Sequence, residues 1–93
     1  MGEQDAILVI DHDPDAALLL SDFLEREGYG VLEARDGAEA LEMIRGGTAS
    51  YEVVVSDIVM PRLNGVELMQ ALASSHPDLP VILMSGYATD ALS

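Results

Sequence analysis

Four short, mostly apolar runs divide the sequence, and a helix-like segment separates each run from the next. The runs lie at residues 6–10, 30–34, 51–56 and 80–84. Apolar runs that do not alternate with polar residues predict strands buried on both faces, the arrangement of a parallel sheet covered by helices. Their starts recur about every 25 residues, as expected for βα units joined by short loops. We therefore predict the order β-α-β-α-β-α-β and a doubly wound parallel α/β sheet.

Capping signals bound the three helices between these strands. Asp13-Pro14 combines an N-cap with a proline at the first helical position. This helix should stop at Gly28, and its apolar spacing predicts a core-facing side made of Ala16, Leu19, Leu20, Phe23 and Leu24. Capping boxes predict that the other two helices start at residues 36–39 and 64–67. Their predicted ends are Gly46-Gly47 and the residue before Pro77.

Polar side chains follow three of the predicted strands at their carboxyl ends. Asp11, His12 and Asp13 come after the first strand, Asp57 after the third and Ser85 after the fourth. In doubly wound sheets this edge is where ligands bind. Neighbouring carboxylates repel each other unless a proton or a hard cation lies between them, and oxygen ligands suit Mg²⁺. A carboxylate beside such a cation can accept a phosphoryl group.

The residues from 6 to about 90 resemble the receiver domain of bacterial two-component response regulators. The most specific stretch is residues 56–65, in which an aspartate is followed by a proline four residues on and a glycine eight residues on, here Asp57, Pro61 and Gly65. The stretches 36–41 and 80–87 fit the same pattern. We expect Pro61 and Gly65 to shape the backbone, with Gly65 allowing a tight turn into the third helix.

The resemblance implies a flavodoxin-like (CheY-like) three-layer sandwich, with the receiver domain spanning residues 5–93. A fifth strand at the same spacing would begin near residue 105, so we expect this chain to lack the fifth βα unit. It would also lack the lysine that the family places on strand 5 against the phosphoryl group, because the sequence contains no lysine.

The resemblance also implies a role for each residue of the site. Asp57 would accept a phosphoryl group from a phosphohistidine on a histidine kinase or a phosphotransfer protein. Asp11, Asp57 and the backbone carbonyl of Val59 would hold Mg²⁺, and Ser85 would contact the phosphoryl oxygens and couple phosphorylation to loop movement. Such a domain is a signalling module that at most catalyses its own phosphorylation and dephosphorylation.

His12 departs from the family pattern, which usually has two adjacent acids at the end of the first strand. Imidazole is a poor Mg²⁺ ligand and suits softer divalent ions such as Mn²⁺, Zn²⁺ or Cu²⁺. His12 is thus either a further metal ligand, with Mn²⁺ as an alternative ion, or an exposed loop residue. The imidazole and the missing lysine also leave open a pseudo-receiver, a protein-interaction module that works without phosphorylation.

The composition limits the partners. Four basic and seventeen acidic residues give a net charge of −13, which excludes a broad surface for nucleic acid or anionic membranes. The absence of cysteine excludes disulfides and thiolate chemistry. No apolar run approaches the roughly 20 residues of a membrane span, and the first residues lack a signal peptide's basic region, so we expect a cytoplasmic protein. With an open sheet edge at the fourth strand and an uncovered first helix, we expect homodimers, exchanged elements or marginal stability.

Overall fold

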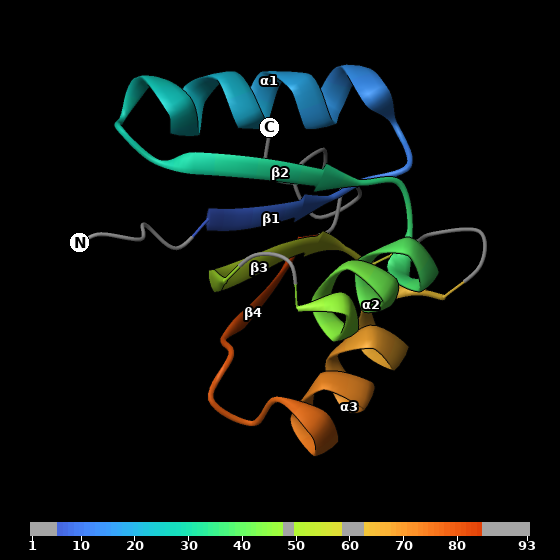
Figure 1. Cartoon of the computed structure of the whole chain (residues 1–93). Helices are drawn as coiled ribbons and strands as arrows, with labels where there is room; N and C mark the ends of the chain where they lie inside the picture. Colours follow the sequence, from blue (N-terminus) through green and yellow to red (C-terminus); the bar gives the residue numbers. More distant parts are fainter. Residues whose placement is uncertain (1–5, 48–49, 59–62, 85–93) are drawn as a thin grey trace.

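The computed structural model describes residues 6–47, 50–58 and 63–84 (Figure 1). Within these ranges, four parallel strands form one sheet. They are β1 (Ala6–Ile10), β2 (Gly30–Ala34), β3 (Tyr51–Asp57) and β4 (Val81–Met84), in the order β2-β1-β3-β4. The chain reverses its direction across the sheet at β1, which leaves a topological switch point between β1 and β3. The predicted doubly wound α/β sheet is confirmed.

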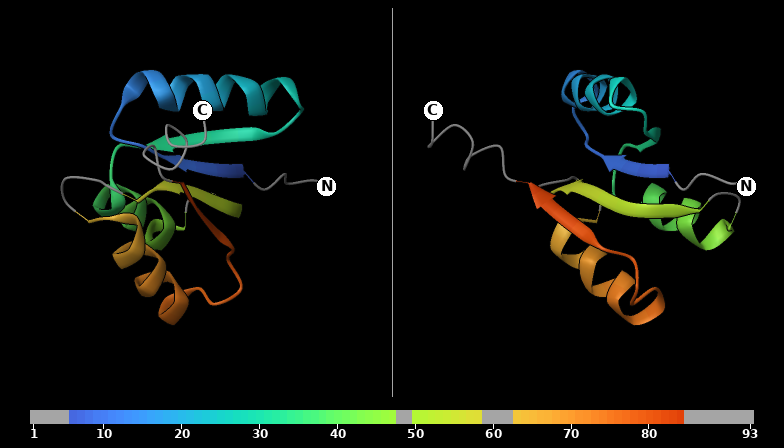
Figure 2. Two further views of the ribbon diagram at one scale, coloured as in Figure 1. Left: turned by 180° about the vertical axis from the view of Figure 1, so that it is seen from behind. Right: turned by 90° about the vertical axis from the view of Figure 1, so that its left-hand side faces the viewer.

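The sheet is covered on both sides, which explains why β1 and the middle of β3 are continuously apolar. Helix α1 (Pro14–Arg26) lies on one face, and α2 (Gly37–Gly46) and α3 (Gly65–Ser75) lie on the other (Figures 1 and 2). Side chains of β1 alternate between two hydrophobic clusters. Leu8 and Ile10 pack with residues of α2 and α3, whereas Ile7 and Val9 pack with Ala17 of α1. These four side chains of β1 are 5 % exposed or less.

Helix α1 turns a different side to the sheet from the one its leucines predict. Leu19 and Phe23 were expected in the core but are 75 % and 59 % exposed, so this part of the prediction is wrong. The buried side consists of Ala17 and Ser21, with Leu20 and Leu24 packed beside the sheet. Small residues at the centre of this side let the helix lie close to the strands, whereas hydrophobic periodicity gives most weight to the largest side chains.

The predicted helix starts are confirmed, with one change of detail. Asp13 caps α1 by accepting a hydrogen bond from the Asp15 amide at 3.0 Å. Asn64 and Glu67 form the expected reciprocal capping box of α3. At α2, Asp36 accepts from the Glu39 amide, but the Glu39 carboxylate accepts from the Arg35 amide, one residue before the cap. Each arrangement pairs amides that a helix end leaves without an intrahelical acceptor.

The helix ends agree with the glycine and proline signals. Gly47 caps α2 in the left-handed region, with φ of 67°, and α3 ends at Ser75, before His76 and Pro77. Helix α1 ends two residues before Gly28, which has φ of 98°. Among the helices that the structure describes, none is long and apolar enough to cross a bilayer.

Candidate functional site

The two central strands bring Asp11 and Asp57 to the same edge of the sheet. Strands β1 and β3 are hydrogen-bonded neighbours, and Ile10 of β1 is in register with Ser56 of β3. Because parallel strands end at the same edge, the residues that follow this pair, Asp11 and Asp57, meet at the switch point. Their side chains are 11 % and 19 % exposed. Two carboxylates predicted from separate parts of the sequence therefore lie together and are largely shielded from water.

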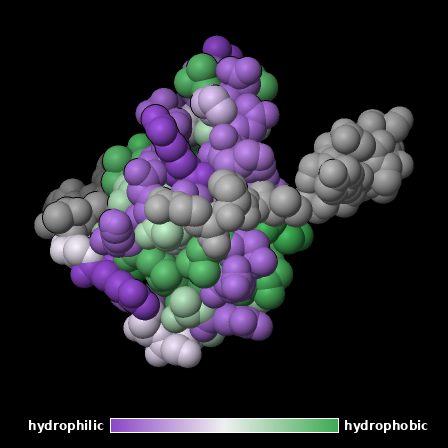
Figure 3. Space-filling model, turned by 90° about the vertical axis from the view of Figure 1, so that its right-hand side faces the viewer, coloured by the Kyte–Doolittle hydropathy of each residue, from purple (hydrophilic) through white to green (hydrophobic). Residues whose placement is uncertain are grey.

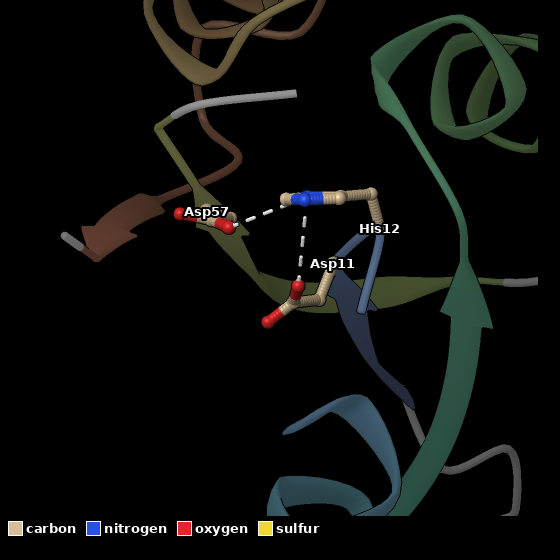
Figure 4. A group of neighbouring side chains, drawn as sticks. All are labelled: Asp11, His12 and Asp57. Carbon is tan, nitrogen blue, oxygen red and sulfur yellow. Dashed lines mark ion pairs between the residues drawn. The ribbon is translucent and has the colours of Figure 1, made fainter. Parts of the chain in front are cut away.

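His12 completes a cluster with these carboxylates (Figure 4). Its Nδ1 lies 3.7 Å from Asp57 Oδ2 and 4.0 Å from Asp11 Oδ1. One ligand atom from each of the three residues lies within 4.8 Å of the others. The imidazole is 49 % exposed, so it lies on the solvent side of the carboxylates. The sequence left His12 open between a ligand and a loop residue, and the structure directs its ring toward both acids.

Asp13 serves the helix and the orientation of Asp11. Its carboxylate accepts from the Asp15 amide as the α1 cap, and its own amide donates to Asp11 Oδ1 at 2.9 Å. The Asp11 amide in turn donates to the carbonyl of Ala34 at 3.2 Å. These bonds hold Asp11 at the strand end and direct one carboxylate oxygen. Asp13 is therefore a cap, as the sequence predicts, and lies outside the three-residue cluster.

The backbone around Asp57 is held by contacts that sequence reasoning did not identify. Ser56 is fully buried, and its hydroxyl donates to the Asp57 carbonyl at 2.9 Å. The amide of Ile58 donates to the carbonyl of Met84 at 3.0 Å, and the amide of Gly65 donates to the carbonyl of Ile58 at 2.9 Å. Ser56 lies at the end of an apolar run, and no feature of the sequence around it indicates that its hydroxyl contacts the Asp57 backbone.

Gly65 has a different role from the predicted one. Its φ lies outside the positive range, so no left-handed turn requires a glycine here. A Cβ at this position would instead come within 2.5 Å of the Asp57 carbonyl oxygen and 3.0 Å of Ile58 Cα. The glycine lets the start of α3 pack directly against the end of β3. The requirement is for close approach rather than for a turn.

The surface around the cluster is polar and partly hollow. A cavity of about 580 Å³ opens beside Asp11 and His12, and Glu33, Arg35 and Glu39 contribute charged groups to its lining. Viewed toward the carboxyl ends of the strands, hydrophilic residues dominate the region below α1, and hydrophobic residues gather lower down (Figure 3). Three of the predicted site and motif residues, Val59, Pro61 and Ser85, lie outside the described residues.

Comparison with known families identifies the family to which this chain belongs. The family described as response regulator receiver domain matches residues 7–93 of the chain. The chain belongs to this family. It is a receiver domain of two-component signal transduction, and receiver domains are signalling domains rather than classical enzymes. The expected family and flavodoxin-like fold are confirmed, and the pseudo-receiver alternative is not favoured.

Relatives of the receiver domain occur within much longer proteins. It is 44 % identical over 70 residues to the sensor kinase CckA of Brucella abortus, covering 75 % of this chain and 7 % of that protein. It is 33 % identical over 84 residues to the transcriptional regulatory protein CpxR of Escherichia coli K12, covering 90 % of this chain and 34 % of CpxR. The chain thus spans at most about a third of the length of these two relatives.

Solved structures show the same architecture. The response regulator TrrA of Thermotoga maritima, in complex with Mg²⁺ and BeF, superposes with a TM-score of 0.84 at 34 % identity, over 92 % of this chain and 73 % of TrrA. TrrA bound to the histidine kinase ThkA superposes with a TM-score of 0.80 at 33 % identity, over 90 % of this chain and 71 % of TrrA.

Proposed function

We propose that Asp57 of this receiver domain accepts a phosphoryl group from a phosphohistidine on a histidine kinase or a phosphotransfer protein. The observation that carries the proposal is the position of Asp57 at the end of β3, beside Asp11, which directly follows the neighbouring strand β1. Relatives support it, because TrrA binds Mg²⁺ and BeF in one structure and a histidine kinase in another. The proposal includes a cytoplasmic location.

The reaction at Asp57 is a transfer between two nucleophiles. A carboxylate oxygen of Asp57 forms a bond to phosphorus while the bond from phosphorus to the imidazole nitrogen of the donor breaks. The imidazole leaves with the electron pair of that bond, and Asp57 becomes an acyl phosphate. Because its side chain is still 19 % exposed, Asp57 can be reached by a donor at the edge of the sheet. Hydrolysis of the acyl phosphate by water would return the domain to its starting state.

The donor set fits a hard divalent cation through its oxygen atoms. Asp11 and Asp57 are two shielded carboxylates side by side, and Mg²⁺ binds one or two carboxylates while keeping several waters. In our proposal these two residues and the Val59 carbonyl hold Mg²⁺, or Mn²⁺ in its place. The cation would neutralise charge that develops on the transferring group. Without it, the paired negative charges oppose the approach of a phosphate donor.

Other residues orient the acceptor or respond to its modification. The Ser56 hydroxyl and the amide contacts of Ile58 and Gly65 hold the end of β3, so Asp57 projects from a rigid support. We assign Ser85 the contact to a phosphoryl oxygen, since it directly follows β4 in the sequence and a short hydroxyl can donate to the new oxygens. Any catalysis by the domain would be limited to its own phosphorylation and dephosphorylation.

Labelling with a small phosphodonor tests the proposal. The protein is incubated with Mg²⁺ and acetyl phosphate, and intact mass spectrometry counts the phosphoryl groups added. We expect one group on the unmodified chain and none on Asp57→Asn. Asp22→Asn, an exposed acid of α1 paired with Arg26 at 3.1 Å, is the matched control and should be labelled normally. Labelling that persists in Asp57→Asn would refute the assignment, and no labelling of the unmodified chain would favour the pseudo-receiver.

A further inference from the structure

The third member of the cluster, His12, offers a nitrogen atom to a metal ion where a further acid would offer an oxygen, and this affects which ions the site can prefer. A further acid near the site, Asp13, is occupied as the cap of α1 and as the donor that orients Asp11. The cluster within ligand distance, as far as the chain is described, therefore consists of two carboxylates and the His12 imidazole. No other described residue adds a side chain to this group.

The distances from His12 to the two acids allow its ring to share an ion with either of them. Two ligand atoms on a metal with bonds of about 2.0–2.2 Å can be separated by up to about 4.4 Å. The His12 Nδ1 atom lies 3.7 Å from an oxygen of Asp57 and 4.0 Å from an oxygen of Asp11, both within that limit. The two carboxylates are shielded, whereas the imidazole is half exposed on the solvent side. Packing therefore restricts the His12 ring less than it restricts the two acids.

The chemistry of this set disfavours Mg²⁺ relative to softer ions. A carboxylate at position 12 would add a negative charge and an oxygen ligand, both of which Mg²⁺ prefers. Imidazole supplies neither, so the attraction for Mg²⁺ falls. For ions later in the first transition row, the nitrogen ligand compensates for the lost charge, and affinity rises from Mn²⁺ toward Cu²⁺ and Zn²⁺. An imidazole in place of a carboxylate at position 12 therefore lowers the affinity for Mg²⁺ and maintains the affinity for the transition-metal ions.

We propose that this receiver domain prefers a borderline divalent transition-metal ion, of the class of Mn²⁺ and Zn²⁺, over Mg²⁺, with His12 as the third side-chain ligand. This rests on the proposed function only in using Asp11 and Asp57 as the metal-binding pair. As a consequence, phosphorylation of Asp57 would depend on which of these ions is available to the protein. The identity of one side chain, rather than the fold, would determine which ion the site prefers.

Calorimetric titration with Mg²⁺, Mn²⁺ and Zn²⁺ separately tests the preference on the full chain. We expect Zn²⁺ to bind more tightly than Mn²⁺, and both to bind more tightly than Mg²⁺. His12→Asp should strengthen Mg²⁺ binding and weaken Zn²⁺ binding, so that the ratio of the Zn²⁺ affinity to the Mg²⁺ affinity falls. His12→Ala should weaken Zn²⁺ binding without strengthening Mg²⁺ binding.

The second histidine of the sequence provides the matched control. His76 lies at the end of α3, where its Nδ1 is 2.8 Å from the Ser75 hydroxyl, and it belongs to a cavity separate from the site. His76→Ala should leave all three affinities unchanged. In NMR spectra, one equivalent of Zn²⁺ should shift the ring signals of His12 and leave those of His76 in place.

The results separate this proposal from the proposed function. Equal affinities for Zn²⁺ in the unmodified chain and His12→Ala would overturn the metal preference, even if acetyl phosphate still labels Asp57. Tighter binding of Mg²⁺ than of Mn²⁺ and Zn²⁺ by the unmodified chain would overturn it as well. If His12 binds Zn²⁺ but Asp57 is labelled with none of the three ions, the phosphoacceptor assignment fails and the metal preference stands.

Discussion

One buried hydroxyl group, that of Ser21, lowers the stability of the domain. Ser21 of α1 is 4 % exposed, and among the described residues its hydroxyl has no hydrogen-bond partner. A buried polar group without a partner loses its hydration and gains nothing in return. Ser21→Ala should therefore raise the free energy of unfolding by about 1 kcal/mol, measured by urea denaturation. Ser74→Ala, an exposed change in α3, is the control and should have little effect.

Ionisation of Tyr51 should make the domain less stable at alkaline pH. Burial raises the pKa of the Tyr51 phenol above its ordinary value of 10.0, because desolvation disfavours the phenolate. The unfolded chain then loses its proton at a lower pH than the folded chain does. The stabilising contribution is complete below about pH 10 and is lost as the pH rises through the folded-state value.

Replacing this phenol should flatten the alkaline decline. In Tyr51→Phe, urea midpoints should fall less than in the unmodified chain between about pH 9 and pH 11. Tyr29→Phe serves as the control, because Tyr29 is 46 % exposed, and should leave the decline unchanged. An equal decline in Tyr51→Phe and the unmodified chain would contradict this account.

The positions of the two acids in the site could be predicted from the sequence, whereas the roles of their neighbours could not. Asp11 and Asp57 were predictable because each directly follows a buried apolar run, and parallel topology brings such ends together. The orientation of His12 was not, since a loop residue after a strand can face solvent or the site with the same pattern around it. Ser56 was also missed, because its role depends on a carbonyl one residue away rather than on any periodic signal.

Among the elements, the junction of β3 and α3 links packing to the proposed chemistry. Gly65 approaches the Asp57 carbonyl so closely that a methyl group would have to displace backbone atoms. Gly65→Ala should lower the free energy of unfolding by about 1–3 kcal/mol, the usual cost of overpacking. It should also slow labelling by acetyl phosphate, because the strand end that carries Asp57 must shift. Denaturation curves and time-resolved mass spectrometry measure the two effects.

A second glycine provides the control for this prediction. Gly46 ends α2, and a Cβ there would have nothing within 4 Å. Gly46→Ala should leave labelling unchanged and keep or slightly raise stability, since alanine favours the helix by up to about 1 kcal/mol. Loss of labelling in both variants would show that the effect of Gly65→Ala is not specific to the contact with Asp57.

Element boundaries were largely predictable, and the facing of α1 was not. Caps and glycines are local signals, so the starts and ends of α2 and α3 follow from a few residues each. The rotation of α1 about its axis depends on which side chains fit against β1 and β2. Small residues decide that fit, and hydrophobic periodicity gives them the least weight.

For the whole molecule, apolar surface on the α1 side of the sheet favours self-association. Leu18, Leu19 and Phe23 of α1 are 59–75 % exposed. Ile82 of β4 is 53 % exposed and lies in register with Val55, whose cluster faces α1, so it belongs to the same side. Exposed apolar residues gathered on one side, beside β4 at the edge of the sheet, favour pairing with a second copy.

From this exposed apolar surface we expect a homodimer at micromolar concentration, measured by size-exclusion chromatography with light scattering. Phe23→Glu places a charge within this surface and should shift the protein toward monomer, because burying an unpaired carboxylate in an interface is costly. Met69→Glu is the matched control: Met69 is 38 % exposed on α3, on the opposite side of the sheet. It should leave the dimer intact. A monomer that unfolds cooperatively at every concentration tested would show that the α1 side is stable in water without a partner.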